Sequence, residues 1–74
     1  MGEVTSTVEQ TLRTRIESEE YKPGDRLPSE RTLAAELGAG RTTIRLVLGK
    51  LVALGLIEAQ HGRGYFVSSP SSKG

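Results

Sequence analysis

The short stretch Gly38-Ala39-Gly40 constrains the fold of this chain more than any other, because it separates two amphipathic segments by a tight turn. Apolar residues recur with the period of a helix from about Ser29 to the turn, and they do so again within residues 41–54. The buried face of the second segment is predicted to consist of Ile44, Val47, Leu48, Leu51 and Leu54. Two helices joined by a tight, glycine-containing turn are typical of a helix-turn-helix.

A further helix is predicted upstream, from about Thr5 to Glu19. Its apolar residues, at every fourth position, are Val4, Val8, Leu12 and Ile16. Pro23-Gly24 is a strong turn signal that ends this region, and Arg26-Leu27 is expected to form a very short strand. Ser29 is a suitable N-cap for the next helix, because its hydroxyl can accept a hydrogen bond from a free N–H group of the first turn.

A β-hairpin is predicted directly after the helix-turn-helix. Residues 56–60 and 65–68 have the composition of two short strands, and His61-Gly62-Arg63-Gly64 suits a polar hairpin tip between them. A two-stranded ribbon in this position is the wing of a winged helix. The predicted fold is therefore α+β and mainly helical, a winged helix-turn-helix of three helices and a two-stranded β-wing.

The length of 74 residues allows one small domain, which we expect over residues 1–67. The Ser-, Pro- and Gly-rich residues 68–74 are expected to be a flexible linker toward a C-terminal effector domain that is absent from this chain. With no cysteine and one histidine a zinc site is not expected, and no apolar run reaches the length of about 20 residues that a membrane span needs. We see no catalytic constellation and no signal peptide, so we expect a cytoplasmic protein that is not an enzyme and binds neither cofactor nor membrane.

Charge is distributed unevenly, although the net charge is only +1. Residues 1–30 contain four basic and seven acidic residues, whereas residues 41–64 contain four basic residues and one acidic residue. A basic surface attached to an acidic support suits a polyanion such as DNA. An ordinary solvated surface is the alternative interpretation of the charge alone.

The second helix of the motif is the candidate recognition helix, since that helix enters the major groove in helix-turn-helix proteins. Arg41 and Arg45 lie four residues apart on the side opposite the apolar face, where an arginine fork can bond guanine or phosphate. Thr42 and Thr43 provide hydroxyls in the first turn, within reach of phosphate oxygens. The alternative is that all four residues merely face solvent, but the turn before them and the wing after them favour DNA contact.

Two further DNA contacts are predicted outside this helix. Arg31 lies early in the preceding helix, which crosses the DNA backbone, although an ion pair with Glu36 is an alternative use of its charge. The wing tip combines His61, Gly62 and Arg63, whose flexible backbone and potential cations could enter the minor groove. A plain hairpin turn with a surface histidine is the alternative there.

Four stretches of the sequence follow one another in the order of a known family. They are Pro23-Gly24-Asp25-Arg26-Leu27-Pro28-Ser29-Glu30-Arg31, Arg41-Thr42-Thr43-Ile44-Arg45, Gly55-Leu56-Ile57 and Gly62-Arg63-Gly64-Tyr65-Phe66-Val67. Over residues 8–67 the chain resembles the GntR family of bacterial transcriptional regulators, and the FadR-like branch slightly more than the HutC-like branch. The resemblance implies a repressor that binds a palindromic double-stranded operator as a homodimer, with a small-molecule effector bound by a C-terminal domain. It also implies DNA contacts by Arg31, Arg41, Thr42, Thr43, Arg45, His61, Gly62 and Arg63.

Four positions depart from the family pattern. Thr32 replaces the usual acid of the second helix, and Gly40 replaces the usual Ser or Thr before the recognition helix, so both helix starts lose a capping group. Leu46 replaces a glutamate after Arg45, and we expect it either to be partly exposed or to pack against the first helix. Gly49 within the recognition helix is expected to cost about 1 kcal/mol against alanine.

Two other functions stay open on the sequence alone. A winged helix can serve as a protein-interaction module, which would require an exposed apolar patch. In one branch of the family the winged helix is joined to a domain resembling a pyridoxal-phosphate aminotransferase, and only sequence beyond this chain would decide that case. By itself the chain is expected to be mostly monomeric and to bind DNA weakly, since one half-site offers few contacts.

Overall fold

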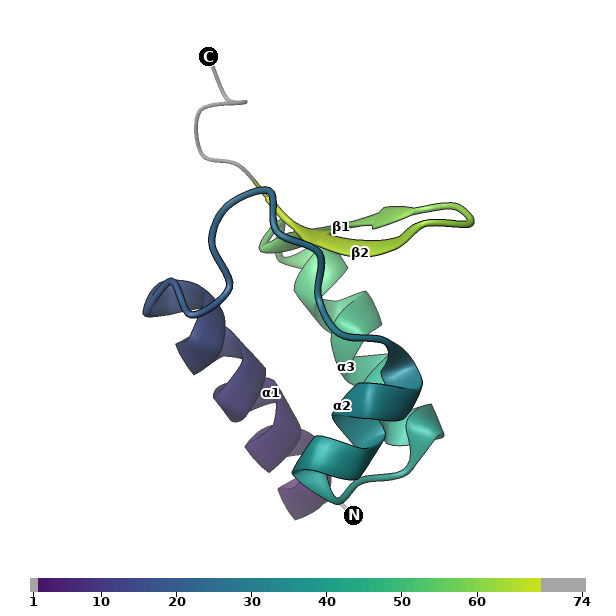
Figure 1. Cartoon of the computed structure of the whole chain (residues 1–74). Helices are drawn as coiled ribbons and strands as arrows, with labels where there is room; N and C mark the ends of the chain where they lie inside the picture. The colour runs from purple at the N-terminus through teal and green to yellow at the C-terminus, as the bar shows by residue number, and fades with distance from the viewer. Residues whose placement is uncertain (1, 69–74) are drawn as a thin grey trace.

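The computed structural model describes residues 2–68, with side chains from Thr5 onward. Three helices precede a two-stranded antiparallel sheet, in the order α1 (Gly2–Glu17), α2 (Glu30–Leu37), α3 (Arg41–Ala53), β1 (Ile57–Gln60) and β2 (Gly64–Val67). A tight turn joins α2 to α3, and the hairpin follows α3 directly (Figure 1). This arrangement confirms the predicted winged helix-turn-helix. Of the predicted linker, residues 69–74 lie outside the described part of the chain.

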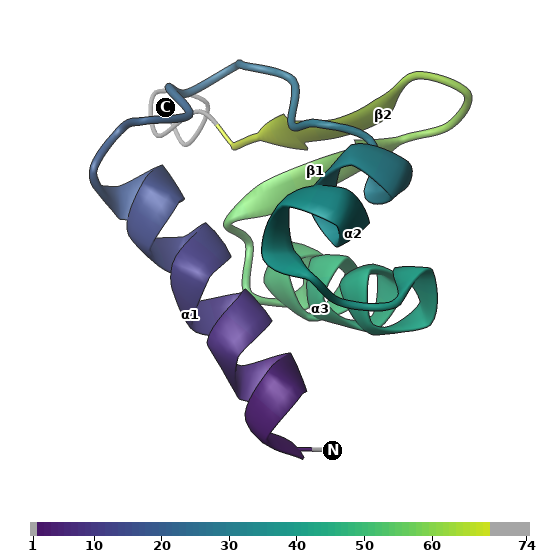
Figure 2. The ribbon, with the colours of Figure 1, turned by 60° about the horizontal axis from the view of Figure 1, so that its bottom comes forward.

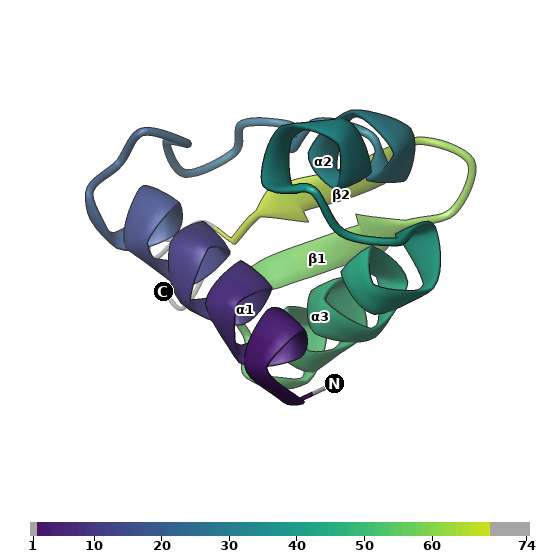
Figure 3. The same ribbon diagram turned by 90° about the horizontal axis from the view of Figure 1, so that it is seen from below.

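One apolar core joins all five elements. α3 contacts α1, α2 and β1, and Figures 2 and 3 show α1 and α2 along different sides of it. The buried apolar side chains come from every element and from the loop before α2: Val8, Leu12, Leu27, Leu33, Ile44, Val47, Leu48, Leu51, Ile57 and Val67. The predicted stripes of the first and third helices therefore supply most of this core, because helical periodicity places residues three and four apart on one face.

The prediction that Leu54 belongs to the buried face is wrong. The residue is 51% exposed: it is the C-cap of α3, still in a helical conformation, and lies about 80° around the axis from Ile44, at the edge of the apolar stripe. Gly55, with a φ of +80°, turns the chain toward β1. Leu56, beyond this turn, packs against the core in place of Leu54.

The predicted bounds of the first helix are also wrong at both ends. α1 spans Gly2–Glu17, whereas Thr5–Glu19 was expected. Glu19 has a φ of +65°, and this left-handed conformation cannot continue a right-handed helix. The helix therefore ends before the Pro23-Gly24 turn that the sequence indicated as its stop.

The start of α2 agrees with the sequence-based prediction. Ser29 is extended, and its Oγ accepts a hydrogen bond of 3.1 Å from the backbone N–H of Thr32, which makes it the N-cap. The Ser29 hydroxyl also donates to Oγ1 of Thr32 over 3.0 Å. Gly38, with a φ of +65°, ends the helix, and its N–H donates to the carbonyl of Ala34. By contrast, no side chain caps α3 at Gly40, as the loss of the usual hydroxyl predicted.

The wing is fastened to the body of the domain along β2. Ile57 pairs with Val67 at its root, and Gln60 pairs with Gly64 next to its tip. On the other edge of β2, Arg26 and Phe66 form an isolated β-bridge, which is all that remains of the very short strand predicted there. Because β2 is bonded on both edges, the direction of the wing relative to α2 is fixed.

Candidate nucleic-acid interface

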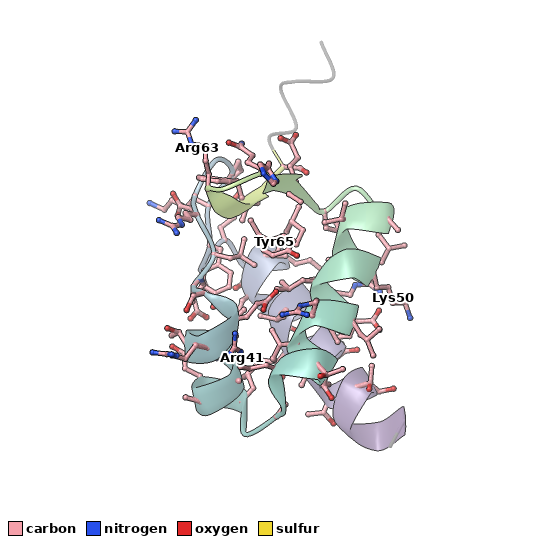
Figure 4. All side chains as sticks on the ribbon, turned by 90° about the vertical axis from the view of Figure 1, so that its right-hand side faces the viewer. Arg41, Lys50, Arg63 and Tyr65 are labelled. Carbon is pink, nitrogen blue, oxygen red and sulfur yellow. The ribbon has the colours of Figure 1, made fainter. Side chains whose placement is uncertain are left out.

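The predicted contact residues come from three elements on one face of the domain. In Figure 4, Arg41 lies at the start of α3, between α2 and α3, and Arg63 projects from the tip of the wing above α2. Lys50 points away on the opposite edge of α3. The start of α3, the start of α2 and the wing tip thus border one surface, which we call the basic face; its cationic residues are Arg26, Arg31, Arg41, Arg45 and Arg63.

The arginines at the three corners of the basic face are available to a ligand. Arg31, Arg41 and Arg63 are exposed, and none of them forms an ion pair within residues 2–68. The alternative partner of Arg31 is excluded, because Glu36 instead accepts a 3.0 Å bond from Arg15 of α1. Exposed guanidinium groups without an internal partner suit an anionic ligand, which they can bind through two parallel hydrogen bonds.

Arg45 differs from these arginines because a carboxylate of the same chain binds it. Its Nε donates to Oε2 of Glu30 over 3.3 Å, and its Nη2 donates to Oε1 over 3.1 Å. This hydrogen bonding lowers the pKa of the Glu30 carboxyl below its ordinary value, with the positive charges of Arg45 and Arg41 adding to the effect. The same bond raises the pKa of Arg45. The pair joins the first residue of α2 to the middle of α3.

Glu30 occupies only one edge of the Arg45 fork. The bonds run to Nε and Nη2, so Nη1 and the outer hydrogen of Nη2 stay free to donate. That outer edge is the one that can span two acceptors of a base. Arg45 therefore keeps a complete fork for an external ligand while Glu30 fixes its direction.

Sequence reasoning missed Arg26. A hollow of about 480 Å³ lies between the start of β2, near the tip of the wing, and the starts of α2 and α3, and Arg26, Arg31 and Arg41 line it together with Gly64. A Cβ at Gly64 would lie 3.2 Å from Nε of Arg26, so the guanidinium rests directly on the glycine backbone. The sequence could have indicated the direction of Arg26. Leu27 is an apolar residue that is buried, and because successive side chains of an extended segment point to opposite sides, its neighbour Arg26 points outward.

The wing tip has the exposure that a minor-groove contact requires. His61, Gly62 and Arg63 are all exposed, and the N–H of Arg63 closes the turn on the carbonyl of Gln60 over 2.9 Å. Gly62 has a φ of +75°, which favours glycine at this point of the tip. Tyr65, further along β2, packs against the core and does not offer a free ring for stacking.

The two threonines of α3 differ in exposure. Thr42 is exposed, whereas Thr43 is half-buried, so Thr42 presents its hydroxyl more fully on the basic face. Lys50, the remaining basic residue of α3, is bound to Glu9 of α1 over 3.1 Å. This ion pair lies on the α1 side of α3 and leaves Lys50 outside the basic face.

Other kinds of site find little support in the described residues. Among residues 2–68, no three His, Asp or Glu side chains gather where they could bind a metal ion. No helix in the same range has both the length and the apolar character to cross a membrane.

Comparison with known proteins gives a consistent result over nearly the whole chain. Residues 4–67 match the family model described as bacterial regulatory proteins, gntR family. The chain is 46% identical over 59 residues to the HTH-type transcriptional repressor NagR of Bacillus subtilis, covering 80% of this chain and 24% of NagR. It is 48% identical over 50 residues to the HTH-type transcriptional regulator Rv0494 of Mycobacterium tuberculosis, covering 68% of this chain and 21% of that protein. The chain thus spans a quarter or less of these relatives.

A solved structure adds a nucleic-acid complex to this comparison. The DNA-binding domain of AraR, in complex with operator ORE1, superposes with a TM-score of 0.84 at 31% sequence identity. The match covers 88% of this chain and 79% of the AraR chain. A protein of the same fold and of related sequence therefore binds DNA.

Proposed function

Because the chain belongs to the GntR family of bacterial regulatory proteins, we propose that it is the operator-reading domain of a transcriptional repressor. The supporting observation is the basic face, where arginines from α2, α3, the wing and the loop before α2 converge on one surface. Its relatives are named as transcriptional regulators, and the AraR complex supplies a precedent for DNA as the ligand. An enzymatic role has no comparable support among the described residues.

We propose that α3 enters the major groove, where Arg41 and the free edge of Arg45 bond base edges or phosphates. Arg31 at the start of α2 then faces the DNA backbone, and the wing tip follows the minor groove. The proposed contact residues are Arg31, Arg41, Thr42, Thr43, Arg45, His61, Gly62 and Arg63. To these we add Arg26, since it lines the same hollow as Arg31 and Arg41.

A dimer on a palindromic operator is the second part of the proposal. Half-sites about one helical turn apart would each receive one recognition helix. The matched segment makes up 24% of NagR, so such a regulator has ample further chain for a domain that dimerises and binds a small-molecule effector. Residues 68–74 are proposed as the linker to that domain, and the cytoplasm, where bacterial DNA lies, as the compartment.

The test begins with selection of binding sites for this chain from a pool of random-sequence duplexes. The selected duplex is then used in mobility-shift titrations with wild type, Arg41→Ala and Arg45→Ala. Each substitution should weaken binding by about 1–3 kcal/mol, the value of a good bidentate contact. Arg13→Ala is the matched control, because Arg13 lies on α1 beside Glu9 and away from the basic face. The assignment of α3 as the recognition helix fails if both arginine variants bind as tightly as wild type.

A further inference from the structure

Leu46 is a large apolar side chain in an unexpected environment. It lies in the middle of α3 and is 64% exposed, more than Leu54, the other large apolar side chain that the described residues leave on the surface. The expectation of partial exposure is thereby confirmed, and packing against α1 does not bury it. An exposed leucine gains little from folding, because the stabilisation of apolar groups comes from removing their area from water.

Leu46 lies at the edge of the proposed recognition surface. With about 3.6 residues per turn, it lies between the exposed Thr42, one turn before it, and Lys50, one turn after it. Gly49 also lies about one turn after Leu46, and a Cβ built there would meet nothing within 4 Å. Arg45 is the adjacent residue, with its outer edge free. The surface around Leu46 is therefore open and borders groups that can bond a base.

We propose that Leu46 reads a thymine, by contact with the C5 methyl group in the major groove of the half-site contacted by Arg45. This inference rests on the proposed function. Thymine is the base that presents an apolar group in the major groove, and aliphatic side chains contact that methyl. Leu46 directly follows Arg45 on α3, with its side chain about 100° further around the helix, so both contacts are expected in the same half-site.

A methyl group suits Leu46 better than a protein partner does. Leu54 lies eight residues further along, which is about 12 Å along the helix axis and about 80° around it. The two leucines therefore do not form a continuous patch, whereas a specific protein interface buries about 1,600 Å² in total. A single isolated leucine matches the size of a single apolar group on a base edge.

Charge around Leu46 also favours approach to DNA. Two acids from other helices pair with basic residues of α3, Glu30 with Arg45 at 3.1 Å and Glu9 with Lys50 at 3.1 Å. A glutamate at the position of Leu46 would bring a further negative charge toward the phosphates. The leucine removes that repulsion and replaces it with an apolar contact.

The experiment removes one methyl group at a time. The duplex selected from the random pool is synthesised with each thymine in turn replaced by deoxyuridine, which keeps the base pair and loses only the methyl. For wild type, one thymine in each half-site should show about a fourfold loss of affinity on replacement, as expected for one apolar carbon. For Leu46→Ala, the thymine and deoxyuridine duplexes should bind equally at that position.

Two control variants separate the loss of methyl recognition from a loss of folding. Leu54→Ala, at the other exposed leucine, should keep the full sensitivity to the methyl group. Leu46→Gln keeps the size and the helix propensity of the side chain but should lose that sensitivity, which covers the case in which Leu46→Ala does not fold. Far-ultraviolet circular dichroism checks the helix content of each variant.

The outcomes distinguish this inference from the proposed function. If wild type binds the selected duplex with a steep salt dependence but no deoxyuridine weakens binding, the methyl contact is overturned and operator binding stands. The same holds if Leu46→Ala and Leu46→Gln retain the loss seen in wild type. If wild type selects no duplex and shifts none, both the proposed function and the methyl contact are overturned.

Discussion

The carboxylate of Glu30, the first residue of α2, bonds one edge of the Arg45 guanidinium on α3, with Nε–Oε2 at 3.3 Å and Nη2–Oε1 at 3.1 Å. The two residues are 15 positions apart in sequence, and the turn between the helices brings them together. An arginine side chain is otherwise free to rotate, and ordering it on DNA would cost conformational entropy. Glu30 therefore acts as a positioning residue for Arg45.

Glu30→Gln is expected to lower the discrimination between the selected duplex and a shuffled one. The Arg45 fork loses its charged partner and samples more directions, so its contact with a base weakens. Affinity for the shuffled duplex should rise, because a negative charge close to the phosphates is removed. The measurement is the ratio of the two dissociation constants at the same salt concentration.

Glu36→Gln is the matched control for this variant. It removes the same charge from the same helix, but its carboxylate faces Arg15 of α1 at 3.0 Å. The ratio should stay close to that of wild type. Equal gains in affinity for both duplexes in Glu30→Gln would mean that Glu30 acts through its charge alone and does not position Arg45.

The pKa of Glu30 should respond to the loss of Arg45. The hydrogen bond from Arg45 is the main cause that lowers this pKa, and the Coulomb attraction of Arg45 and then of Arg41 adds to it. In Arg45→Ala the pKa should therefore rise toward the ordinary value of a glutamate, while Arg41 keeps a smaller effect. Titration of the Glu30 carboxyl carbon by NMR measures both values, and an unchanged midpoint would contradict the pair in solution.

The same shift fixes the direction of the pH dependence. A carboxyl whose pKa is lowered in the folded state stabilises the fold at pH values above its unfolded pKa. That stabilisation is lost as the pH falls through the lowered pKa of the folded state. As the pH falls through this acidic range, the free energy of unfolding of wild type should therefore decrease more than that of Arg45→Ala. Near neutral pH the free energy of unfolding of both proteins should change with pH by the same slope.

The fold could be predicted from the sequence because local signals agree with one another. Ser29 is a cap that the sequence identifies without tertiary information, and the spacing of Ile44, Val47 and Leu48 fixes the buried side of α3. Leu54 continues that spacing at the edge of the stripe but is exposed, since periodicity does not say how much of a helix face other elements cover. The early end of α1 was missed because periodicity does not say where a helix ends either.

The candidate site was predictable only in part. Arg31, Arg41 and the wing tip follow from their places in the elements, and the structure brings them to one face. The Glu30–Arg45 pair joins two helices, and the contact of Arg26 with Gly64 joins a loop to a strand. Side-chain contacts between elements depend on packing angles that no local pattern contains. Membership of the FadR-like branch stays a prediction.

Arg26→Ala is expected to weaken binding to all duplexes by a similar factor. Arg26 lines the hollow between the wing and the helices, and we expect it to contact a phosphate there and not a base edge. Loss of one phosphate contact should lower the slope of log affinity against log salt by about 1. Mobility shifts at several salt concentrations measure the slope, with Arg13→Ala on α1 as the control. A loss confined to the selected duplex would instead indicate a base contact.

Gly49→Ala is expected to stabilise the domain by about 1 kcal/mol, because alanine loses less backbone entropy in a helix. Gly49 lies in α3, and its added Cβ would meet no atom within 4 Å, so no clash offsets the gain. Urea unfolding followed by circular dichroism provides the free energy of unfolding. A loss of stability would show that the backbone of α3 at this position is not the regular helix described above.

Gly64→Ala is expected to destabilise the domain, for a reason in the backbone and a reason in a side-chain contact. Gly64 has a φ of +119°, a conformation that side chains with a Cβ rarely adopt, and its Cβ would lie 3.2 Å from Nε of Arg26. Strained backbone conformations cost about 1–3 kcal/mol each, so unfolding should require less urea than for wild type. Gly62→Ala at the wing tip is a comparison without the contact, since Gly62 also has a positive φ, of +75°, but no atom within 4 Å of its Cβ.

The double variant Gly64→Ala with Arg26→Ala tests the contact itself. If Arg26 rests on Gly64 as described, removing the guanidinium should relieve part of the cost of the added methyl, and the two changes should not be additive. The relief should be absent when Arg26→Ala is combined with Gly62→Ala. Strict additivity in both pairs would mean that Arg26 turns away from the wing in solution, and its assignment to the basic face would then fail.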